Sequence, residues 1–166
     1  MKGLTVLTTL AYQGKHWDGL IAALDGAEVL RFDSPETEGF DAALARADVA
    51  ILRKDPEPRL LAAPKLRWIH VDHAGLNRAA KPEAFREGLV ITGSSGRSSP
   101  VLAEHALFFA LALAYRYPAF LDAQRAHQWG VPGQDDLRGL YGCTMGIVGM
   151  GNTGTELAVR AKAFGM

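Results

Sequence analysis

The chain of 166 residues carries 18 basic and 18 acidic residues, so its formal net charge is zero, and hydrophobic residues make up 48% of it. This composition is typical of a globular chain with a packed core, and the balanced, scattered charge predicts no nucleic-acid partner and no membrane surface. The single cysteine, Cys143, excludes an intrachain disulfide and suits a reducing compartment, so we expect a cytoplasmic protein.

Short apolar runs alternate with helical patterns over residues 1–95. The predicted strands are 4–8, 28–32, 49–53, 67–71 and 89–92, and the predicted helices are 15–24, 37–47, 58–63 and 83–86. Strands that alternate with helices are typical of α/β proteins, in which a mostly parallel sheet carries helices on both faces. Ligands bind such sheets at the loops that follow the carboxyl ends of the strands, so we expect a binding site there.

Two of these loops carry residues suited to an anion. Arg53 and Lys54 follow the third predicted strand, and the prolines at 56 and 58 would hold both cations in a rigid turn. They suit an anionic substrate, or they are an ordinary solvated pair of charges. In the next turn, His-Ala-Gly-Leu-Asn at 73–77, the backbone amides around Gly75 could bind a carboxylate, although a plain connecting turn is an equal alternative.

A hinge and a long apolar helix follow the predicted sheet. The loop 92–100 is rich in glycine and serine, and we place the boundary there, between domains 1–97 and 98–166. Ser99 suits the N-cap and Pro100 the first position of a helix that runs until Pro118 breaks it, before a second helix at 119–129. The first helix is apolar nearly all round, so we expect it to be covered on several sides, and His105 within it is interpreted as a hydrogen-bonded core histidine.

The stretch 144–166 predicts a strand, a glycine turn and a helix. The apolar run 145–148 ends at Gly149, Gly151 and Gly154, which have the spacing G-x-G-x-x-G, and a helix-forming run covers 155–164. The first glycine permits a tight turn, the second lets the backbone approach a pyrophosphate, and the third allows close packing at the helix N-terminus. The pattern predicts a dinucleotide cofactor, NAD or NADP, whereas a glycine turn that binds nothing is the alternative.

Four stretches together resemble the D-isomer-specific 2-hydroxyacid dehydrogenase family, and they lie at 64–77, 101–115, 124–129 and 140–166. The resemblance implies a flavodoxin-like parallel-sheet substrate domain, a long interdomain helix, and the first strand, turn and helix of a Rossmann domain. It also implies an NAD(P)-dependent oxidoreductase that transfers a hydride between nicotinamide and a small 2-hydroxy acid, of the glyoxylate- or hydroxypyruvate-reductase type. The implied assembly is a homodimer through the helices at 99–129.

The resemblance assigns roles to particular residues. It places the cofactor pyrophosphate at Gly149, Met150, Gly151, Asn152, Thr153 and Gly154, and the substrate at Gly75, Leu76, Arg53 and Lys54. Asn77 and Gly93 depart from the family's usual aspartate and asparagine. No metal site is implied.

The family's catalytic arginine, its acidic partner and its acid/base histidine match no residue here, because in the family's pattern they follow position 166. We therefore expect a truncated enzyme whose 166 residues alone are inactive, with most of the stable core in residues 1–95 and a strand at 145–148 that lacks its neighbours. The alternative is a non-catalytic dimerisation or binding module derived from the same family.

Overall fold

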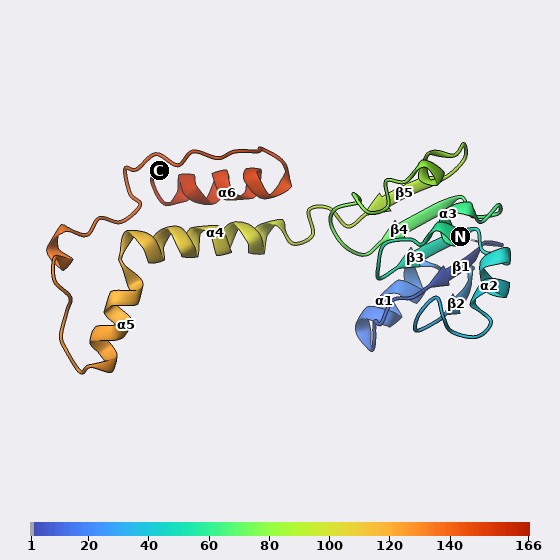
Figure 1. Cartoon of the computed structure of the whole chain (residues 1–166), viewed down its shortest axis with the longest axis horizontal. Coiled ribbons are helices and arrows are strands. Elements are labelled where there is room, and N and C mark those ends of the chain that lie inside the picture. Colours follow the sequence, from blue (N-terminus) through green and yellow to red (C-terminus); the bar gives the residue numbers. More distant parts are fainter. Residues whose placement is uncertain (1) are drawn as a thin grey trace. The chain divides into compact units, whose positions relative to one another are not determined.

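The structure is a computed structural model that describes residues 2–166. Five parallel strands form one sheet in the order β2-β1-β3-β4-β5, as Figure 1 shows. They are β1 (Thr5–Thr8), β2 (Glu28–Arg31), β3 (Val49–Leu52), β4 (Trp68–Val71) and β5 (Val90–Gly93). This is the flavodoxin-like strand order, and the five strand predictions are confirmed to within a residue at each end.

The connections between the strands are helical, as predicted. They are α1 (Lys15–Ala23), α2 (Phe40–Arg46), α3 (Pro58–Ala62) and the 3-10 helix η1 (Pro82–Phe85). The last of these was expected as a short α-helix at 83–86. It is a single tight turn because Pro82 suits a helical first turn while Gly88, with a φ of 78°, turns the chain toward β5.

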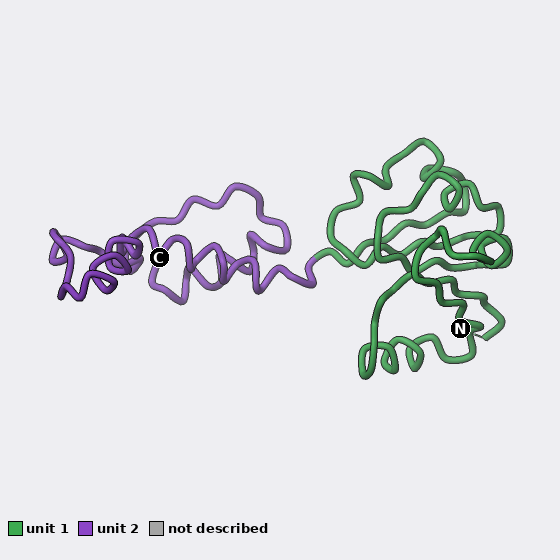
Figure 2. The backbone as a smooth tube through the Cα atoms, turned by 60° about the horizontal axis from the view of Figure 1, so that its bottom comes forward, with its two compact units in different colours: residues 1–95 green, residues 96–166 purple. Residues whose placement is uncertain are grey.

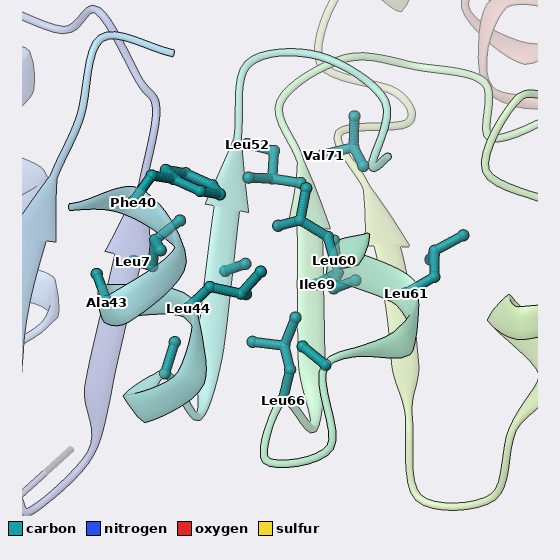
Figure 3. Close-up of a cluster of buried hydrophobic side chains, with 13 residues drawn as sticks. Leu7, Phe40, Ala43, Leu44, Leu52, Leu60, Leu61, Leu66, Ile69 and Val71 are labelled. Atoms are coloured by element: carbon teal, nitrogen blue, oxygen red, sulfur yellow. The ribbon is translucent and has the colours of Figure 1, made fainter. Parts of the chain in front are cut away.

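The sheet buries a different set of side chains on each face. Helices α2 and α3 cover one face, where Phe40, Leu60 and Leu61 pack against Leu7 and Ile69 of the strands (Figure 3). On the opposite face, the core cluster joins Leu24, just after α1, to alternate strand residues such as Val6, Val49 and Ile51. Both clusters lie within the first 95 residues, as expected for the stable core.

The chain separates into two compact units, residues 1–95 and 96–166 (Figure 2). The second unit consists of α4 (Ser99–Ala114), α5 (Tyr117–Arg125), the 3-10 helix η2 (Gln134–Asp136) and α6 (Asn152–Ala163). Helix α6 packs along α4 (Figure 1). Arg160 of α6 is bound by Glu156 and lies 3.4 Å from Glu104 of α4; these two carboxylates, Glu156 first, raise the pKa of the guanidinium.

The ends of these helices differ from the predictions in detail. Ser98 rather than Ser99 is the N-cap of α4. The break after α4 comes at Arg116, which adopts a φ of 50°, whereas Pro118 lies in the first turn of α5, where a proline removes no helical hydrogen bond. Helix α5 ends at Arg125, four residues earlier than expected, before His127 with a φ of 54°.

The predicted strand at 145–148 is wrong for this structure. Among residues 2–166 no strand pairs with this segment, and α6 follows the glycine turn without a sheet beneath it. The segment nevertheless keeps the alternation of a strand, because Met145 and Ile147 are half-buried while Val148 is fully exposed. A parallel strand needs hydrogen-bonding neighbours, and none of the described residues provides them.

Residues 2–166 cover α4 on only part of its surface, and the expectation that another domain or a second subunit covers the rest stays a prediction. Only Ser99, Ala103 and Leu107 of α4 are buried. His105, interpreted as a core histidine, is exposed and stacks on the ring of Phe109 with centroids 4.6 Å apart. Across the described residues no single helix is long and apolar enough to cross a membrane; α4 and α5 reach that length only as a pair bent by 66°.

Candidate functional site

A broad cleft of about 1080 Å³ lies at the carboxyl ends of β3 and β4. The loop after β3 and the turn after β4 supply its walls, as the parallel topology requires. The lining residues are Arg53, Lys54, Asp55, Pro56, Glu57, Pro58, His73, Ala74, Gly75, Asn77, Arg78 and Lys81. The structure therefore brings Arg53, Lys54 and Gly75, which are far apart in the sequence, into one cleft.

The loop after β3 is fixed at both ends. The amide of Arg53 donates to Thr9 Oγ1 over 3.1 Å, which ties the loop to the end of β1. Pro56 is buried, and Pro58 begins α3. The side chains of Arg53 and Lys54 remain exposed on this rigid backbone, so both charges are available to a ligand.

Two acidic side chains near this loop, Glu57 and Glu36, have polar partners of their own. Glu57 forms an ion pair with Arg59 over 3.0 Å. The pKa of the Glu36 carboxyl is lowered, mainly by a hydrogen bond from Ser34 and by the backbone amide of Glu36 itself. The charges of Arg59 and Lys54 lower it more weakly.

Asp55 presents a buried carboxylate oxygen to the same region. Its Oδ1 atom accepts no hydrogen bond from residues 2–166, and His73 Nε2 lies 3.8 Å away. The other ring nitrogen of His73, Nδ1, lies 3.1 Å from the carbonyl oxygen of Ala74, so a proton on Nδ1 would be donated to that carbonyl. Nε2 of His73, in the turn after β4, therefore faces Asp55, in the loop after β3.

The turn after β4 is open to the cleft and is centred on a glycine. Gly75 is exposed with a φ of 85°, a conformation that L side chains rarely adopt, and a Cβ at this position would meet no other atom within 4 Å. Leu76 does not line the cleft: its side chain packs against the core cluster and beneath Gly93. Only its backbone can therefore contribute to the predicted substrate contact.

The sequence prediction missed two basic residues of the cleft, Arg78 and Lys81. Arg78 lies in the turn that follows Gly75, where the amides of Ala79 and Ala80 donate to the Leu76 carbonyl over 3.0 and 3.1 Å, and Lys81 comes directly after that turn. Both follow Gly75 closely in the sequence, and basic residues so near the carboxyl end of β4 are the signal that could have located them.

A polar network on the α1 side of β4 and β5 was also not predicted. His70 lies between Thr92 Oγ1, at 2.9 Å, and Ser94 Oγ, at 3.1 Å. Asp72, directly after β4, accepts a hydrogen bond from Tyr12 Oη over 2.8 Å. These residues are distant in sequence, so only the strand register brings them together.

The second predicted site, the glycine turn, has a geometry that depends on glycine. Gly149 has a φ of 98°, and Gly151 is the N-cap of α6, where its carbonyl accepts the first helical bond from the Thr155 amide over 2.9 Å. A Cβ on Gly154 would overlap with the Gly149 carbonyl oxygen and would lie 3.0 Å from the carbonyl carbon. Turn and helix therefore approach so closely that no side chain fits between them.

The other predicted residues of this turn lie around the helix N-terminus. Met150 is exposed, the Asn152 side chain packs against Gly96, and Thr153 Oγ1 lies 3.3 Å from Ser99 Oγ. All six predicted residues thus lie on one turn and the start of α6. A glycine-lined helix N-terminus without a side-chain cap suits the pyrophosphate of a dinucleotide, because the backbone can approach the anion and the helix dipole favours negative charge.

No group of three or more potential metal ligands occurs among the described residues. Cys143 is exposed, and its thiol lies 3.5 Å from the Gly139 carbonyl oxygen. Among the described residues, the predicted binding residues thus lie in the cationic cleft of residues 1–95 and on the glycine turn of residues 96–166.

Comparison with known proteins gives consistent matches. Residues 107–166 match the family described as D-isomer specific 2-hydroxyacid dehydrogenase, NAD binding domain. The chain is 33% identical over 150 residues to D-3-phosphoglycerate dehydrogenase of Mycobacterium bovis, and 34% identical over 108 residues to glyoxylate reductase of Korarchaeum cryptofilum. A crystal structure of a D-isomer specific 2-hydroxyacid dehydrogenase family protein from Aeromonas salmonicida matches with 26% identity and a TM-score of 0.76.

These matches cover more of this chain than of the proteins it resembles. They cover 87% of the chain and 28% of the Mycobacterium protein, and 63% of the chain and 32% of the Korarchaeum protein. The structural match covers 98% of the chain and 51% of the Aeromonas protein. The chain thus spans about half of the solved structure and about a third or less of the two curated relatives.

Proposed function

The chain belongs to the D-isomer-specific 2-hydroxyacid dehydrogenase family, and we propose that it forms the substrate cleft and the cofactor's pyrophosphate turn of an NAD(P)-dependent oxidoreductase. The observation that carries the proposal is the placement of Gly75 and Arg53 in one cationic cleft at the carboxyl edge of the sheet. In this proposal residues 1–97 are the substrate domain, and residues 98–166 contain the dimerisation helices and the start of the cofactor domain.

The substrate of the proposed reaction is a small 2-oxo or 2-hydroxy acid of the glyoxylate or hydroxypyruvate type. Backbone amides of the turn at Gly75 and Leu76 bind its carboxylate, a role that suits an exposed glycine with a positive φ. Arg53 and Lys54, on the loop after β3, offset the charge of that carboxylate within the same cleft. The substrate is thereby oriented before reaction.

The cofactor, NAD or NADP, binds at the glycine turn. Gly151 allows the backbone to approach the pyrophosphate, Gly154 keeps the helix close to the turn, and the amides at the start of α6 hold the phosphate oxygens. When bound, the nicotinamide supplies or accepts the hydride. No residue of this chain is assigned to proton transfer, because the family's acid/base histidine matches none of them.

A spectrophotometric assay tests this function. The full-length gene product is mixed with NADH or NADPH and either glyoxylate or hydroxypyruvate, and the loss of reduced cofactor is followed. We expect oxidation that saturates with the 2-oxo acid, and no turnover by residues 1–166 alone. The absence of both oxidation and reduced-cofactor binding by the full-length product would refute the proposal.

A non-catalytic dimerisation module is the second candidate, and one observation favours it. Large apolar side chains along α4 remain exposed within residues 2–166, among them Phe108, Phe109 and Leu113. In this alternative the 99–129 helices bind a second copy of the chain and no hydride transfer occurs. A stable homodimer of a full-length product that binds no reduced cofactor would favour the module.

A further inference from the structure

A chain of hydrogen bonds on the α1 side of the sheet has His70 at its centre. Trp68 Nε1 donates to Thr92 Oγ1 over 2.9 Å, and His70 Nδ1 lies 2.9 Å from the same oxygen. His70 Nε2 lies 3.1 Å from Ser94 Oγ, which donates to Asp72 Oδ1 over 3.4 Å. These side chains belong to β4, β5 and the residues directly after them, so the chain of hydrogen bonds extends along both strands to their carboxyl ends.

The direction of each hydrogen bond in this chain follows from the chemistry of its two ends. An indole nitrogen can only donate, so Thr92 Oγ1 accepts from Trp68, and its own proton is available to His70 Nδ1. A carboxylate can only accept, so Ser94 gives its proton to Asp72 and accepts from His70 Nε2. The ring of His70 therefore carries its proton on Nε2.

The opposite tautomer of His70 would break this chain at two points. With its proton on Nδ1, His70 would donate to Thr92 Oγ1, and the Thr92 hydroxyl would lose its acceptor within the chain. Nε2 would then need the proton of Ser94, which could no longer donate to Asp72. These groups are all half-buried, where an unmade hydrogen bond is costly. The geometry thus favours the tautomer in which His70 orients the Ser94 hydroxyl toward Asp72.

The two residues that the ring joins in this way, Ser94 and Asp72, both support the turn at Gly75. Asp72 directly precedes that turn, and the amide of Ser94 donates to the His73 carbonyl over 3.1 Å. Gly93, before Ser94, approaches so closely that a Cβ there would lie 3.0 Å from the His73 carbonyl oxygen. The start of the turn therefore packs directly on the end of β5.

We propose that His70 is a positioning residue for the substrate cleft, whose hydrogen bonds hold the end of β5 to the start of the turn that binds the substrate carboxylate. Among the described residues, those that line the cleft do not include His70. The inference rests on the function proposed above and adds a residue that acts on the substrate through Ser94 and Asp72. A displaced turn would bind the carboxylate less tightly, so the loss should appear in KM and not in cofactor affinity.

Nuclear magnetic resonance of the histidine rings tests the tautomer in the full-length gene product. With isotope-labelled histidine, correlations between ring nitrogens and ring protons show which nitrogen carries the proton, and the signal that His70→Gln removes belongs to His70. We expect the proton on Nε2 at neutral pH. A proton on Nδ1, or on both nitrogens, would overturn the inference, and this measurement needs no active variant.

Steady-state kinetics with the 2-oxo acid that the wild type reduces tests the positioning role. His70→Leu removes both hydrogen bonds of the ring and should raise KM about tenfold, while kcat changes less than about threefold and the NADH dissociation constant less than about twofold. His70→Gln keeps an acceptor and a donor, so its KM should stay within about threefold of the wild-type value.

Substitution of Ser94 tests whether the chain acts as one unit. Ser94→Ala should raise KM, and the double variant with His70→Leu should be no worse than His70→Leu alone, because both changes remove the same link. Ser98→Ala is the matched control: Ser98 is exposed and its side chain makes no cap bond to α4, so KM should not change. Circular dichroism checks that all variants fold.

Equal KM values in His70→Leu and His70→Gln would overturn the inference, and so would equal values in Ser94→Ala and Ser98→Ala. Failure of the proposed function is a separate result, because it is read from the binding and oxidation of reduced cofactor by the wild type. A protein that oxidises NADH with glyoxylate but keeps its KM in His70→Leu would keep the function and lose the inference.

Discussion

Replacing Gly154 by alanine should displace the glycine turn from α6. The added methyl group would overlap with the Gly149 carbonyl oxygen and would lie 3.0 Å from its carbon, whereas carbon atoms in ordinary contact are about 3.5–4.0 Å apart. Relief of the overlap with the oxygen therefore requires the turn to retreat by about 1 Å or more. Overpacking of this kind typically costs about 1–3 kcal/mol.

The same displacement should weaken cofactor binding. The backbone amides that hold the pyrophosphate are fixed to the start of α6, and each hydrogen bond to a charged phosphate contributes about 1.5–3 kcal/mol. Loss of one such bond lowers affinity about 10- to 100-fold. The quenching of tryptophan fluorescence by NADH, measured on the full-length gene product, gives the dissociation constant directly.

Alanine substitutions at two other glycines distinguish an effect on stability from an effect on cofactor binding. Gly146→Ala has open space around its Cβ and lies before the turn, so neither stability nor affinity should change. Gly151→Ala also has open space within the protein, so the fold should persist while the new methyl obstructs the approaching pyrophosphate. If Gly154→Ala left both thermal stability and NADH affinity unchanged, the close approach of turn and helix would not matter for either property.

Three further predictions concern stability and assembly. The backbone amide of Thr5 lowers the pKa of Asp48 below its ordinary 3.8. The stability that this carboxylate contributes is therefore complete above that pH and is lost as the pH falls through the folded-state pKa. Denaturant titrations should find Asp48→Asn less stable than the wild type near neutral pH, and the difference in unfolding free energy should shrink in acid. Ile69→Ala should lower the free energy of unfolding by about 2–5 kcal/mol because Ile69 is 0% exposed, whereas Val90→Ala, at a position 56% exposed, should change it by less than about 0.5 kcal/mol. Leu113→Glu should shift any α4-mediated dimer toward monomer in sedimentation velocity, and an unchanged distribution would exclude this face of α4 from the interface.

The five strands were predictable because each is a short apolar run between turn-forming residues, and a parallel strand buried on both faces reads as such a run. Ile51 and Leu52, for example, bury their side chains in different clusters on opposite faces of β3. The parallel sheet followed from the alternation of strands and helices, whereas its flavodoxin-like arrangement was implied only by the family resemblance. Element ends were less certain, since a proline such as Pro118 fits both the end of one helix and the first turn of the next.

The candidate cleft was predictable only in part. Arg53 and Gly75 were found because each follows a strand and because the family's pattern marks them. Arg78 and Lys81 look like ordinary surface charges in the sequence, and only their positions on the turn above buried Ala79 direct attention to them. The contact between His70 and Ser94 depends on the register of β4 against β5, which no local pattern specifies.

At residues 145–148 the local sequence pattern and the tertiary structure disagree about a strand. Its apolar, β-branched residues predict a strand, and the alternation of half-buried Ile147 with fully exposed Val148 is the geometry of one. Extended backbone becomes sheet only when another strand accepts its hydrogen bonds, and no strand within residues 2–166 does so. Ile147 instead packs near Gly154, so the glycine that brings α6 close to the turn also partly covers the face of the would-be strand. The close packing of the glycine turn against α6 therefore forms without a surrounding sheet. For this reason the effect of Gly154→Ala can be attributed to the contact between the turn and the helix alone.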